Sequence, residues 1–327
     1  MAVLVTGGAG YIGSHMVLSL LEAGRRVVVL DNLSTGFREA LSPEAAFVEG
    51  DVGDASLIAR TLAEFNVDAV VHFAGSVVVA ESVARPLDYY LNNTVKTRTL
   101  IEACLDGGVR RFIFSSTAAV YGAPTRMPIC EEAASQPISP YGASKAMSER
   151  MLIDAAAASG ATYAIMRYFN VAGADPAGRA GQRARSATHL IKIGIEAAVG
   201  KRKDVTVFGA DYPTPDGTTI RDYIHVSDLV EAHRRALLHL EAGGDSLTLN
   251  CGCGRGYSVR EVLSAIEEEA GVRLVQCDGP PRPGDPPEMI ADCRRIGEAL
   301  GWTPQYDNLR FMIRTAMDFE NAIRRDG

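Results

Sequence analysis

Tyr141 and Lys145 stand four residues apart in the segment SPYGASKAMSER, residues 139–150. If this segment is helical, both side chains project from the same face. A free tyrosine titrates near ~10, too high for a general base at neutral pH, but a lysine cation one turn away stabilises the phenolate. The pair therefore predicts a tyrosine that removes a proton from a hydroxyl group. The alternative is a chance spacing on a surface helix.

Hydroxyl side chains end the apolar run RRFIFSS, residues 110–116. Ser115, Ser116 and Thr117 would stand at the carboxyl end of a strand, which is the edge where ligands bind in parallel sheets. We interpret Thr117 as part of the same site as Tyr141. The alternative is a strand-end residue that only caps a loop.

The segment VTGGAGYIGSH carries Gly7, Gly10 and Gly13 between a predicted strand and a predicted helix. Glycines at this spacing permit a tight turn, let backbone amides approach a pyrophosphate and allow the helix to pack closely on the strand. Asp31 follows eighteen residues later, where a carboxylate binds ribose hydroxyls and repels a 2′-phosphate. These features predict NAD rather than NADP, with a plain glycine-rich turn as the alternative. Asp51, after the third strand, is a candidate adenine contact or a simple turn residue.

The elements that must position these residues alternate through the first half of the chain. Apolar runs predict strands at 2–6, 26–30, 46–50, 68–75, 110–116 and 162–168. Helical patterns lie between them, among them 11–23, 87–105 and 141–158, each ended by a nearby glycine. This alternation predicts the α/β class, with a doubly wound parallel sheet of the Rossmann type.

After about Asn170 the pattern changes, because turn-rich segments separate shorter elements. We expect residues 1–171 to form an NAD-binding domain and residues 172–327 a smaller α/β domain that binds the substrate. Some late segments are expected to pack back onto the first domain.

The totals restrict the classes of function. A net charge of -7 argues against non-specific binding to nucleic acid or to an anionic membrane. No apolar run approaches the ~20 residues that span a bilayer, and the first residues already read as a strand, so we expect no signal peptide. The six cysteines and six histidines show no ligand spacing, so we expect no metal site, reduced thiols and a cytoplasmic location.

Seven segments together resemble the extended short-chain dehydrogenase/reductase superfamily and, within it, the UDP-glucose 4-epimerase family. They are VTGGAGYIGSH, DNLSTG, HFAG, FIFSSTAAVYG, SPYGASK, RYFNVAGADP and FGADYPTPDGTTIRDYIHVSDL. The resemblance runs from Met1 to about Leu229 and reappears at RPGD near Arg282. It implies an enzyme that oxidises a UDP-hexose at C4 with tightly held NAD, turns the 4-keto sugar within the pocket and reduces its other face.

The resemblance also implies roles for individual residues. Tyr141 would be the base, Lys145 its electrostatic partner and Thr117 a hydrogen-bonding partner of the sugar O4. Cofactor contacts are expected from Gly7, Gly10, Tyr11, Ile12, Gly13, Asp31, Asn32, Asp51, Val52, Phe73, Ala74, Gly75, Asn92, Ser115, Tyr141, Lys145 and Tyr168. Substrate contacts are expected from Thr117, Tyr141, Asn170, His189, Leu190, Phe208, Arg221, Arg282, Asp285 and Met289.

Within the substrate set, the resemblance places Phe208 beside the uracil and Asp285 at the ribose. Arg221 and Arg282 would clamp the diphosphate, which suits the planar fork of arginine. The family also pairs subunits through helices equivalent to 87–105 and 141–158, which implies a homodimer.

Departures from the family pattern leave alternatives open. Ala118 and Ala119 stand where nucleotide-sugar 4,6-dehydratases carry Asp-Glu, so elimination is not expected. Val77 replaces a frequent lysine near the cofactor, and Lys192 replaces a frequent proline in a basic loop, 179–192. Met289 stands where residue size decides whether N-acetyl groups enter. UDP-N-acetylhexosamines and UDP-pentoses therefore remain alternative substrates, and a net dehydrogenase or a non-catalytic NAD-sensing protein are alternative functions.

Overall fold

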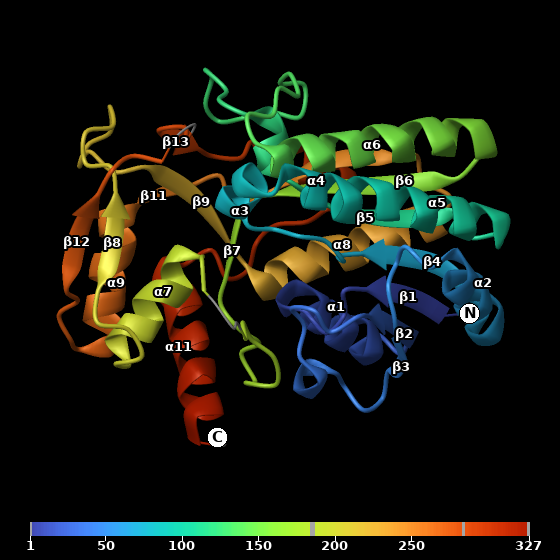
Figure 1. Cartoon of the computed structure of the whole chain (residues 1–327), viewed down its shortest axis with the longest axis horizontal. Helices are drawn as coiled ribbons and strands as arrows, with labels where there is room; N and C mark the ends of the chain where they lie inside the picture. The colour runs from blue at the N-terminus through green and yellow to red at the C-terminus, as the bar shows by residue number, and fades with distance from the viewer. Residues whose placement is uncertain (1, 184–186, 283–284, 326–327) are drawn as a thin grey trace.

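The computed structural model describes residues 2–183, 187–282 and 285–325, and its largest feature is a seven-stranded sheet (Figure 1). The strand order is β10-β6-β5-β4-β1-β2-β3, and all neighbouring pairs are parallel. The strands are β1 (Ala2–Thr6), β2 (Arg26–Asp31), β3 (Ala46–Glu49), β4 (Val67–His72), β5 (Arg111–Thr117), β6 (Thr162–Tyr168) and β10 (Leu247–Cys251). The predicted Rossmann-type α/β class is confirmed.

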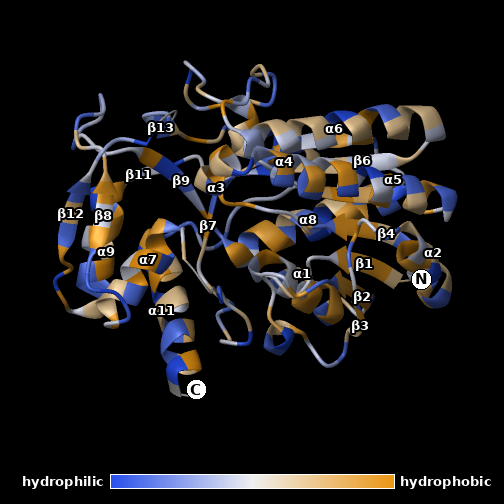
Figure 2. Cartoon of the chain, viewed as in Figure 1, coloured by the Kyte–Doolittle hydropathy of each residue, from blue (hydrophilic) through white to orange (hydrophobic). Residues whose placement is uncertain are grey.

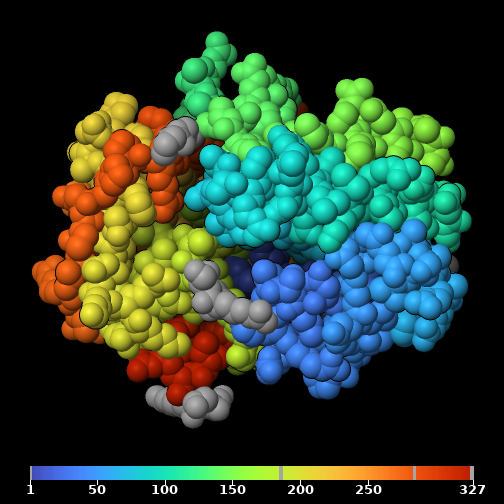
Figure 3. Space-filling model, in the orientation of Figure 1, coloured from blue at the N-terminus to red at the C-terminus, as the bar shows by residue number. Residues whose placement is uncertain are grey.

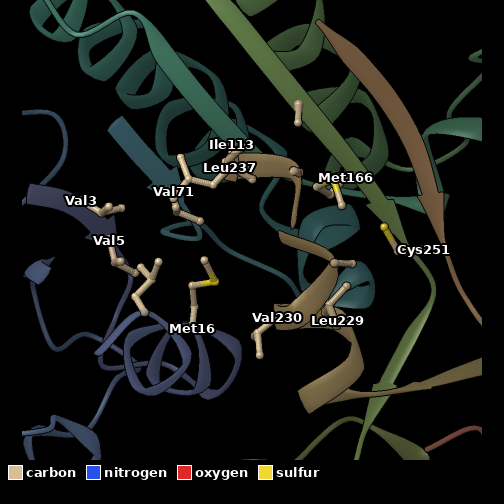
Figure 4. Close-up of a cluster of buried hydrophobic side chains, with 14 of the residues drawn as sticks. Val3, Val5, Met16, Val71, Ile113, Met166, Leu229, Val230, Leu237 and Cys251 are labelled. Carbon is tan, nitrogen blue, oxygen red and sulfur yellow. The ribbon is translucent and has the colours of Figure 1, made fainter. Parts of the chain in front are cut away.

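Helices cover both faces of this sheet because side chains alternate along each buried strand. One face packs against α1 (Tyr11–Glu22) and α8 (Val226–Glu241). We call the buried apolar side chains between this face and these helices the first cluster, and Figure 4 shows Val3, Val5, Met16 and Leu229 within it. The other face packs against α2 (Ala55–Phe65), α5 (Lys96–Asp106) and α6 (Pro140–Ser159). Apolar residues accordingly concentrate on the strands and inner helix faces in Figure 2.

The large sheet draws on residues from the second half of the chain. β10 pairs with β6, so that Cys251 lies opposite Tyr168. α8 packs on α1, and Ile296 of α10 (Arg294–Leu300) and Trp302 are buried in the first cluster. Late segments therefore contribute to this core, and the boundary between residues 171 and 172 stays a prediction.

A smaller group of elements follows the carboxyl edge of the large sheet. β7 (Asn170–Ala172) begins two residues after β6 ends and pairs with β9 (Ile220–His225), which also pairs with β11 (Gly256–Ser258) and β13 (Glu288–Met289). β8 (Val205–Phe208) pairs with β12 (Gln276–Gly279). α7 (Leu190–Ala198), α9 (Val259–Ala270) and α11 (Leu309–Arg325) share a separate apolar cluster. Figure 3 shows a hollow between the blue and cyan first half and the yellow later segments.

The segment predicted as one helix over 87–105 is divided in the structure. It consists of α4 (Pro86–Tyr89), a π-helical turn at Tyr90–Val95 and α5, and α3 (Val79–Ala84) precedes it. Short 3-10 turns lie at Arg38–Ala40 and Ala118–Tyr121. A π turn inserts an extra residue into the helical repeat, which a 3.6-residue pattern does not reveal. In the part of the chain described, we find no helix with the length and apolar character to cross a bilayer.

Leu249 tests whether β10 belongs to the core of the large sheet. Its side chain is fully buried in the first cluster, so Leu249→Ala should lower the free energy of unfolding by about 2–4 kcal/mol. Leu238→Ala is the matched control, since Leu238 on α8 is exposed and its truncation should change that free energy by less than about 0.5 kcal/mol. Urea unfolding measures both. Equal effects would show that β10 does not belong to the cooperative core.

Candidate functional site

The turn between β1 and α1 brings backbone unusually close to backbone. Gly7 has a φ of 71°, and a Cβ there would lie 2.6 Å from the amide nitrogen of Ala74. A Cβ at Gly13 would collide with the carbonyl oxygen of Gly7. Gly10 is the N-cap of α1 and supplies no side-chain hydrogen bond to it. The first amides of α1 are therefore available to an anion, and the turn fits the pyrophosphate of a dinucleotide.

The turn follows β1, the strand from which the sheet is extended first on one side and then on the other. β1 leads outward to β2 and β3, whereas β4, β5 and β6 extend to its other side. Ligands bind at such a switch point in open α/β sheets. The segment Phe73–Gly75, predicted to contact the cofactor, follows β4 and lies against the turn.

Asp31 ends β2 and Asp51 follows β3, both on the β2–β3 side of this switch point. The Asp31 carboxylate accepts hydrogen bonds from the amides of Ala9 (2.9 Å) and Leu33 (2.8 Å). Asp51 accepts from the Asn32 side chain (3.1 Å) and forms an ion pair with Lys96 (2.6 Å). Burial would raise the pKa of Asp51, but its hydrogen bond with Lys96 and its backbone partner hold it below its usual value.

Two other predicted cofactor residues help to pack this region. The Tyr11 hydroxyl donates to the carbonyl of Gly173 at 2.6 Å, which ties the glycine turn to the segment after β7. Ile12 packs against the first cluster, and Val52 is buried on the opposite face of the sheet. Their predicted contacts with NAD remain predictions.

Tyr141 and Lys145 lie in the first turns of α6. Ser139 caps this helix by accepting a hydrogen bond from the Gly142 amide, and Pro140 opens its first turn. Tyr141 is 8% exposed and Lys145 is 3% exposed. The expectation that they share a helix face beside the end of β5 agrees with these positions.

The Lys145 ammonium is held by the end of β5. It donates to the carbonyl of Ser115 at 2.9 Å and lies 5.0 Å from the ring centre of Phe114. Burial lowers the pKa of Lys145 to about 8, and the negative charge of Glu149 acts in the opposite direction. A Cβ at Gly75 would lie 3.6 Å from Nζ, so the cation also borders the predicted cofactor segment.

Thr117 ends β5 and faces the phenol of Tyr141. Burial raises the pKa of Tyr141, and its hydrogen bond with the Thr117 side chain acts in the opposite direction. The protein groups by themselves therefore do not supply the depressed pKa expected from Lys145. A phenolate at this position needs a further positive charge, and the cationic nicotinamide ring of NAD would provide one.

His233 of α8 was not predicted from the sequence. Its ring lies between Phe73 (centroids 5.1 Å apart) and Tyr168 (6.1 Å), and the Tyr168 hydroxyl is hydrogen-bonded to Ser115. Burial lowers the pKa of His233 to about 4, so the ring is neutral at pH 7. Nδ1 contacts the Leu229 carbonyl at 2.8 Å, whereas Nε2 is buried with no partner among the described residues.

Asn93 is a second residue that the sequence did not identify. The predicted contact was Asn92, whose side chain donates to Ser76 Oγ at 2.9 Å. Asn93 is 2% exposed; it accepts from the Ser76 amide (2.7 Å) and donates to Ser144 Oγ (3.1 Å). It thereby connects the loop after β4 to α6. Two adjacent asparagines are indistinguishable by pattern, and only the π turn decides which one points inward.

Four predicted substrate residues gather beside β9 and β8. Arg221 of β9 forms an ion pair with Asp285 and donates to the Pro286 carbonyl at 2.8 Å. The guanidinium carbon of Arg282 lies 4.2 Å above the ring centre of Phe208. These four residues lie on neighbouring segments, as a shared nucleotide site requires. Arg221 and Asp285 bind each other, however, whereas the resemblance implied that Arg221 binds the diphosphate and Asp285 the ribose.

The remaining predicted substrate residues lie on three segments. Asn170 is exposed on β7, and His189 caps α7 and contacts the Gln182 side chain at 3.0 Å, with Leu190 next in the helix. Met289 of β13 is 7% exposed and packs in a cluster that includes Ala118 and Tyr121, directly after Thr117.

The departures from the family pattern have structural counterparts. Val77 is 53% exposed. Lys192 is buried and paired with Glu320 of α11, so its charge is neutralised inside the protein rather than presented by the basic loop. Residues 184–186 of that loop, and 283–284 of the RPGD segment, lie outside the described residues. No group of three or more potential metal-ligating side chains occurs within the described ranges.

Comparison with known proteins identifies the family of this chain. Residues 3–252 match the model of the NAD dependent epimerase/dehydratase family. The UDP-glucose 4-epimerase of Azospirillum brasilense is 56% identical over 323 residues, which cover 99% of this chain and 93% of the relative. The solved UDP-glucose 4-epimerase of Brucella ovis, in complex with NAD, is 45% identical with a TM-score of 0.94, covering 97% of this chain and 98% of that one.

A second solved structure extends the similarity to the full length of both chains. The UDP-glucose 4-epimerase of Bifidobacterium longum, in complex with NAD+ and UDP, is 37% identical with a TM-score of 0.95 and a coverage of 100% of each chain. The resemblance seen in the sequence is thereby confirmed. The chain belongs to the NAD-dependent epimerase/dehydratase family and, within it, to the UDP-glucose 4-epimerases.

Proposed function

We propose that this chain is a UDP-hexose 4-epimerase that interconverts UDP-glucose and UDP-galactose, with NAD as its cofactor. The observation that carries this proposal is one arrangement of three side chains. Tyr141 and Lys145 are buried on α6 against the end of β5, where Thr117 faces the phenol, and this group borders the segment Phe73–Gly75, which lies against the glycine turn. A proton acceptor and a dinucleotide cradle thus meet at one edge of the sheet.

The chemistry divides between the cofactor and the chain. When bound, NAD would supply the hydride acceptor and donor for C4 of the sugar, held by the glycine turn and the segment after β4. In our proposal Tyr141 removes the proton from the C4 hydroxyl and later gives it back. Thr117 holds the sugar O4 by a hydrogen bond. Lys145, anchored on the Ser115 carbonyl, stabilises the phenolate electrostatically.

The nucleotide part of the substrate would bind between β8, β9 and the segment before β13. We assign the diphosphate to Arg221 and Arg282, the uracil to Phe208 and the ribose to Asp285. Arg221 carries five donors, so it can engage a diphosphate if its fork turns away from Asp285 or is shared with it. Asn170, His189, Leu190 and Met289 remain assigned to the sugar and its surroundings by the family resemblance.

We also propose a homodimer, because apolar side chains are exposed along the helices predicted to pair. Leu87 (79% exposed), Leu91 (53%) and Val95 (51%) recur at every fourth residue along α4 and the π turn that follows it. Met147, on α6, is 48% exposed. A contiguous apolar stripe of this kind is typical of a protein–protein interface. We further propose a cytosolic enzyme, in which the cysteine thiols stay reduced.

The first experiment follows inversion at C4 by NMR, without added NAD, for UDP-galactose and for UDP-N-acetylgalactosamine. We expect inversion of UDP-galactose, because NAD is retained during turnover. Inversion of that substrate alone would mean that Met289 keeps the pocket narrow, and inversion of both would establish dual specificity. A net dehydrogenase would instead require added NAD and accumulate NADH. No inversion even with NAD would refute the proposed function.

Tyr141→Phe keeps the ring but removes the proposed base. We expect kcat for UDP-galactose to fall about 10²–10⁴-fold, the usual contribution of a positioned acid–base group. Tyr163→Phe is the matched control. Tyr163 lies near the amino end of β6, away from the carboxyl edge that carries the site, so this substitution should leave kcat unchanged. NMR rates measure both variants. A Tyr141→Phe enzyme within a few-fold of the parent would assign the proton transfer to another group.

Leu91→Asp places a charge in the middle of the proposed dimer interface. We expect this variant to sediment as a monomer at concentrations where the parent sediments as a dimer, because a carboxylate is costly to bury in an apolar contact. Leu238→Asp, at an exposed leucine of α8, should leave the dimer intact. A parent protein that sediments as a monomer would overturn the interface.

A further inference from the structure

Glu149 is a buried carboxylate directly behind the catalytic pair. It stands four residues after Lys145 and eight after Tyr141, so all three side chains share one face of α6. Glu149 is only 3% exposed. A carboxylate buried to this extent must be paired, and its partners show what it does.

Two neighbouring strands bind the Glu149 carboxylate. Arg167 of β6 donates from Nε to Oε1 (3.0 Å) and from Nη2 to Oε2 (2.6 Å), which is a two-pronged ion pair. The hydroxyl of Ser116 in β5 donates to Oε1. Arg167 is itself 8% exposed and also donates to the Tyr121 hydroxyl at 3.0 Å. Glu149 thus joins α6 to the two strands beneath it.

Three contacts join the end of β5 to one face of α6. Each of the last three residues of β5 is matched with one of the three side chains on this face of α6. The pairs are Ser115 with Lys145, Ser116 with Glu149 and Thr117 with Tyr141. A shift of α6 along β5 would break all three contacts together. The Glu149 contact has the strongest partners, because it includes an ion pair with β6.

Glu149 also acts on Lys145 through its charge. Burial lowers the pKa of Lys145, and the negative charge of Glu149 raises it. Tyr141 provides a negative charge only when it is the phenolate, and three further described groups beside the ammonium provide none. Phe114 of β5 presents a ring, Asn93 of the π turn an amide, and His72 of β4 is neutral because burial and the Lys145 charge lower its pKa to about 3.

We propose that Glu149 is a positioning residue for the epimerase reaction. Clamped by Arg167 and Ser116, it holds the face of α6 that carries Tyr141 and Lys145 against the end of β5, and it keeps Lys145 in its cationic form. The inference rests on the proposed function and deepens it. A purely structural ion pair would affect only the stability of the fold.

Glu149→Gln removes the charge and retains the shape. We expect kcat to fall about tenfold or more, as for loss of a hydrogen-bonded charged group, while KM for UDP-galactose stays within about twofold. Lys145 is cationic below its pKa, so a lower pKa means that the cation is lost at lower pH. The alkaline limb of the kcat–pH profile should therefore move to lower pH, because Lys145 then loses the negative charge of Glu149 that raises its pKa.

Arg167→Met is the opposite electrostatic change. It removes the cation and leaves the Glu149 charge uncompensated, so the alkaline limb should move to higher pH. Ser116→Ala alters neither charge; kcat should fall while the limb stays in place. The titration of Lys145 is read directly from the NMR shift of ¹³Cε-labelled lysine, with Lys145→Met to assign the signal, so one readout does not depend on turnover.

Asp228→Asn is the matched control. Asp228 is also a buried carboxylate, but it accepts from the amides of Gln305 and Tyr306, away from α6. Its substitution should lower the unfolding temperature and leave the pH profile unchanged. Circular dichroism establishes that each variant is folded; should Glu149→Gln not fold, Ser116→Ala and Arg167→Met decide the question.

Two results would overturn the inference. One is a folded Glu149→Gln enzyme with unchanged kcat and an unchanged alkaline limb. The other is a shift of the limb and of the Lys145 titration in the same direction in Glu149→Gln and Arg167→Met. Failure of the parent protein to invert UDP-galactose would instead refute the proposed function, and the lysine titrations would still test the electrostatic part.

Discussion

The ammonium group of Lys145 is a positive charge held in the interior of the protein, and the neighbouring elements are arranged around it. Burial disfavours the charged form, which is why the pKa of Lys145 is lowered to about 8. The Ser115 carbonyl, the Phe114 ring and the Glu149 charge offset this cost. These groups belong to β5 and α6, so the cost of burying the cation is offset only while that strand and that helix keep their packing.

The same edge of the sheet brings together two sites that are distant in the chain. The glycine turn follows β1 and the catalytic pair lies against β5, yet β4 alone separates these strands. Gly7 approaches the backbone of Ala74 after β4, and Gly75 borders the Lys145 ammonium. A dinucleotide that extends from the turn along the end of β4 would therefore present its nicotinamide beside Tyr141. This would supply the positive charge that the protein groups do not provide.

The chain returns to this edge after it has formed the smaller group of strands. α8 places His233 between Phe73 and Tyr168, and β10 completes the large sheet beside β6. Just after β7, where the chain has left the large sheet, the Tyr11 hydroxyl donates a hydrogen bond to the carbonyl of Gly173. The proposed cofactor site is thus enclosed by both halves of the chain, and a division at a single residue describes the sequence better than it describes the packing.

The sequence by itself determined what depends on local pattern: the buried parallel strands, the glycine turn, and the shared helix face of Tyr141 and Lys145. Tertiary structure decided which polar groups meet. It buried Asn93 between the loop after β4 and α6, while the cofactor contact predicted for Asn92 remains a prediction. It paired Arg221 with Asp285, Lys192 with Glu320, and Glu149 with Arg167. These partners are separated by 18 to 128 residues along the chain. Glu149 and Lys192 are buried, and a charge removed from water must find an opposite charge wherever the fold brings one. Arg221 and Asp285 form a partly exposed pair that, likewise, only the fold brings together.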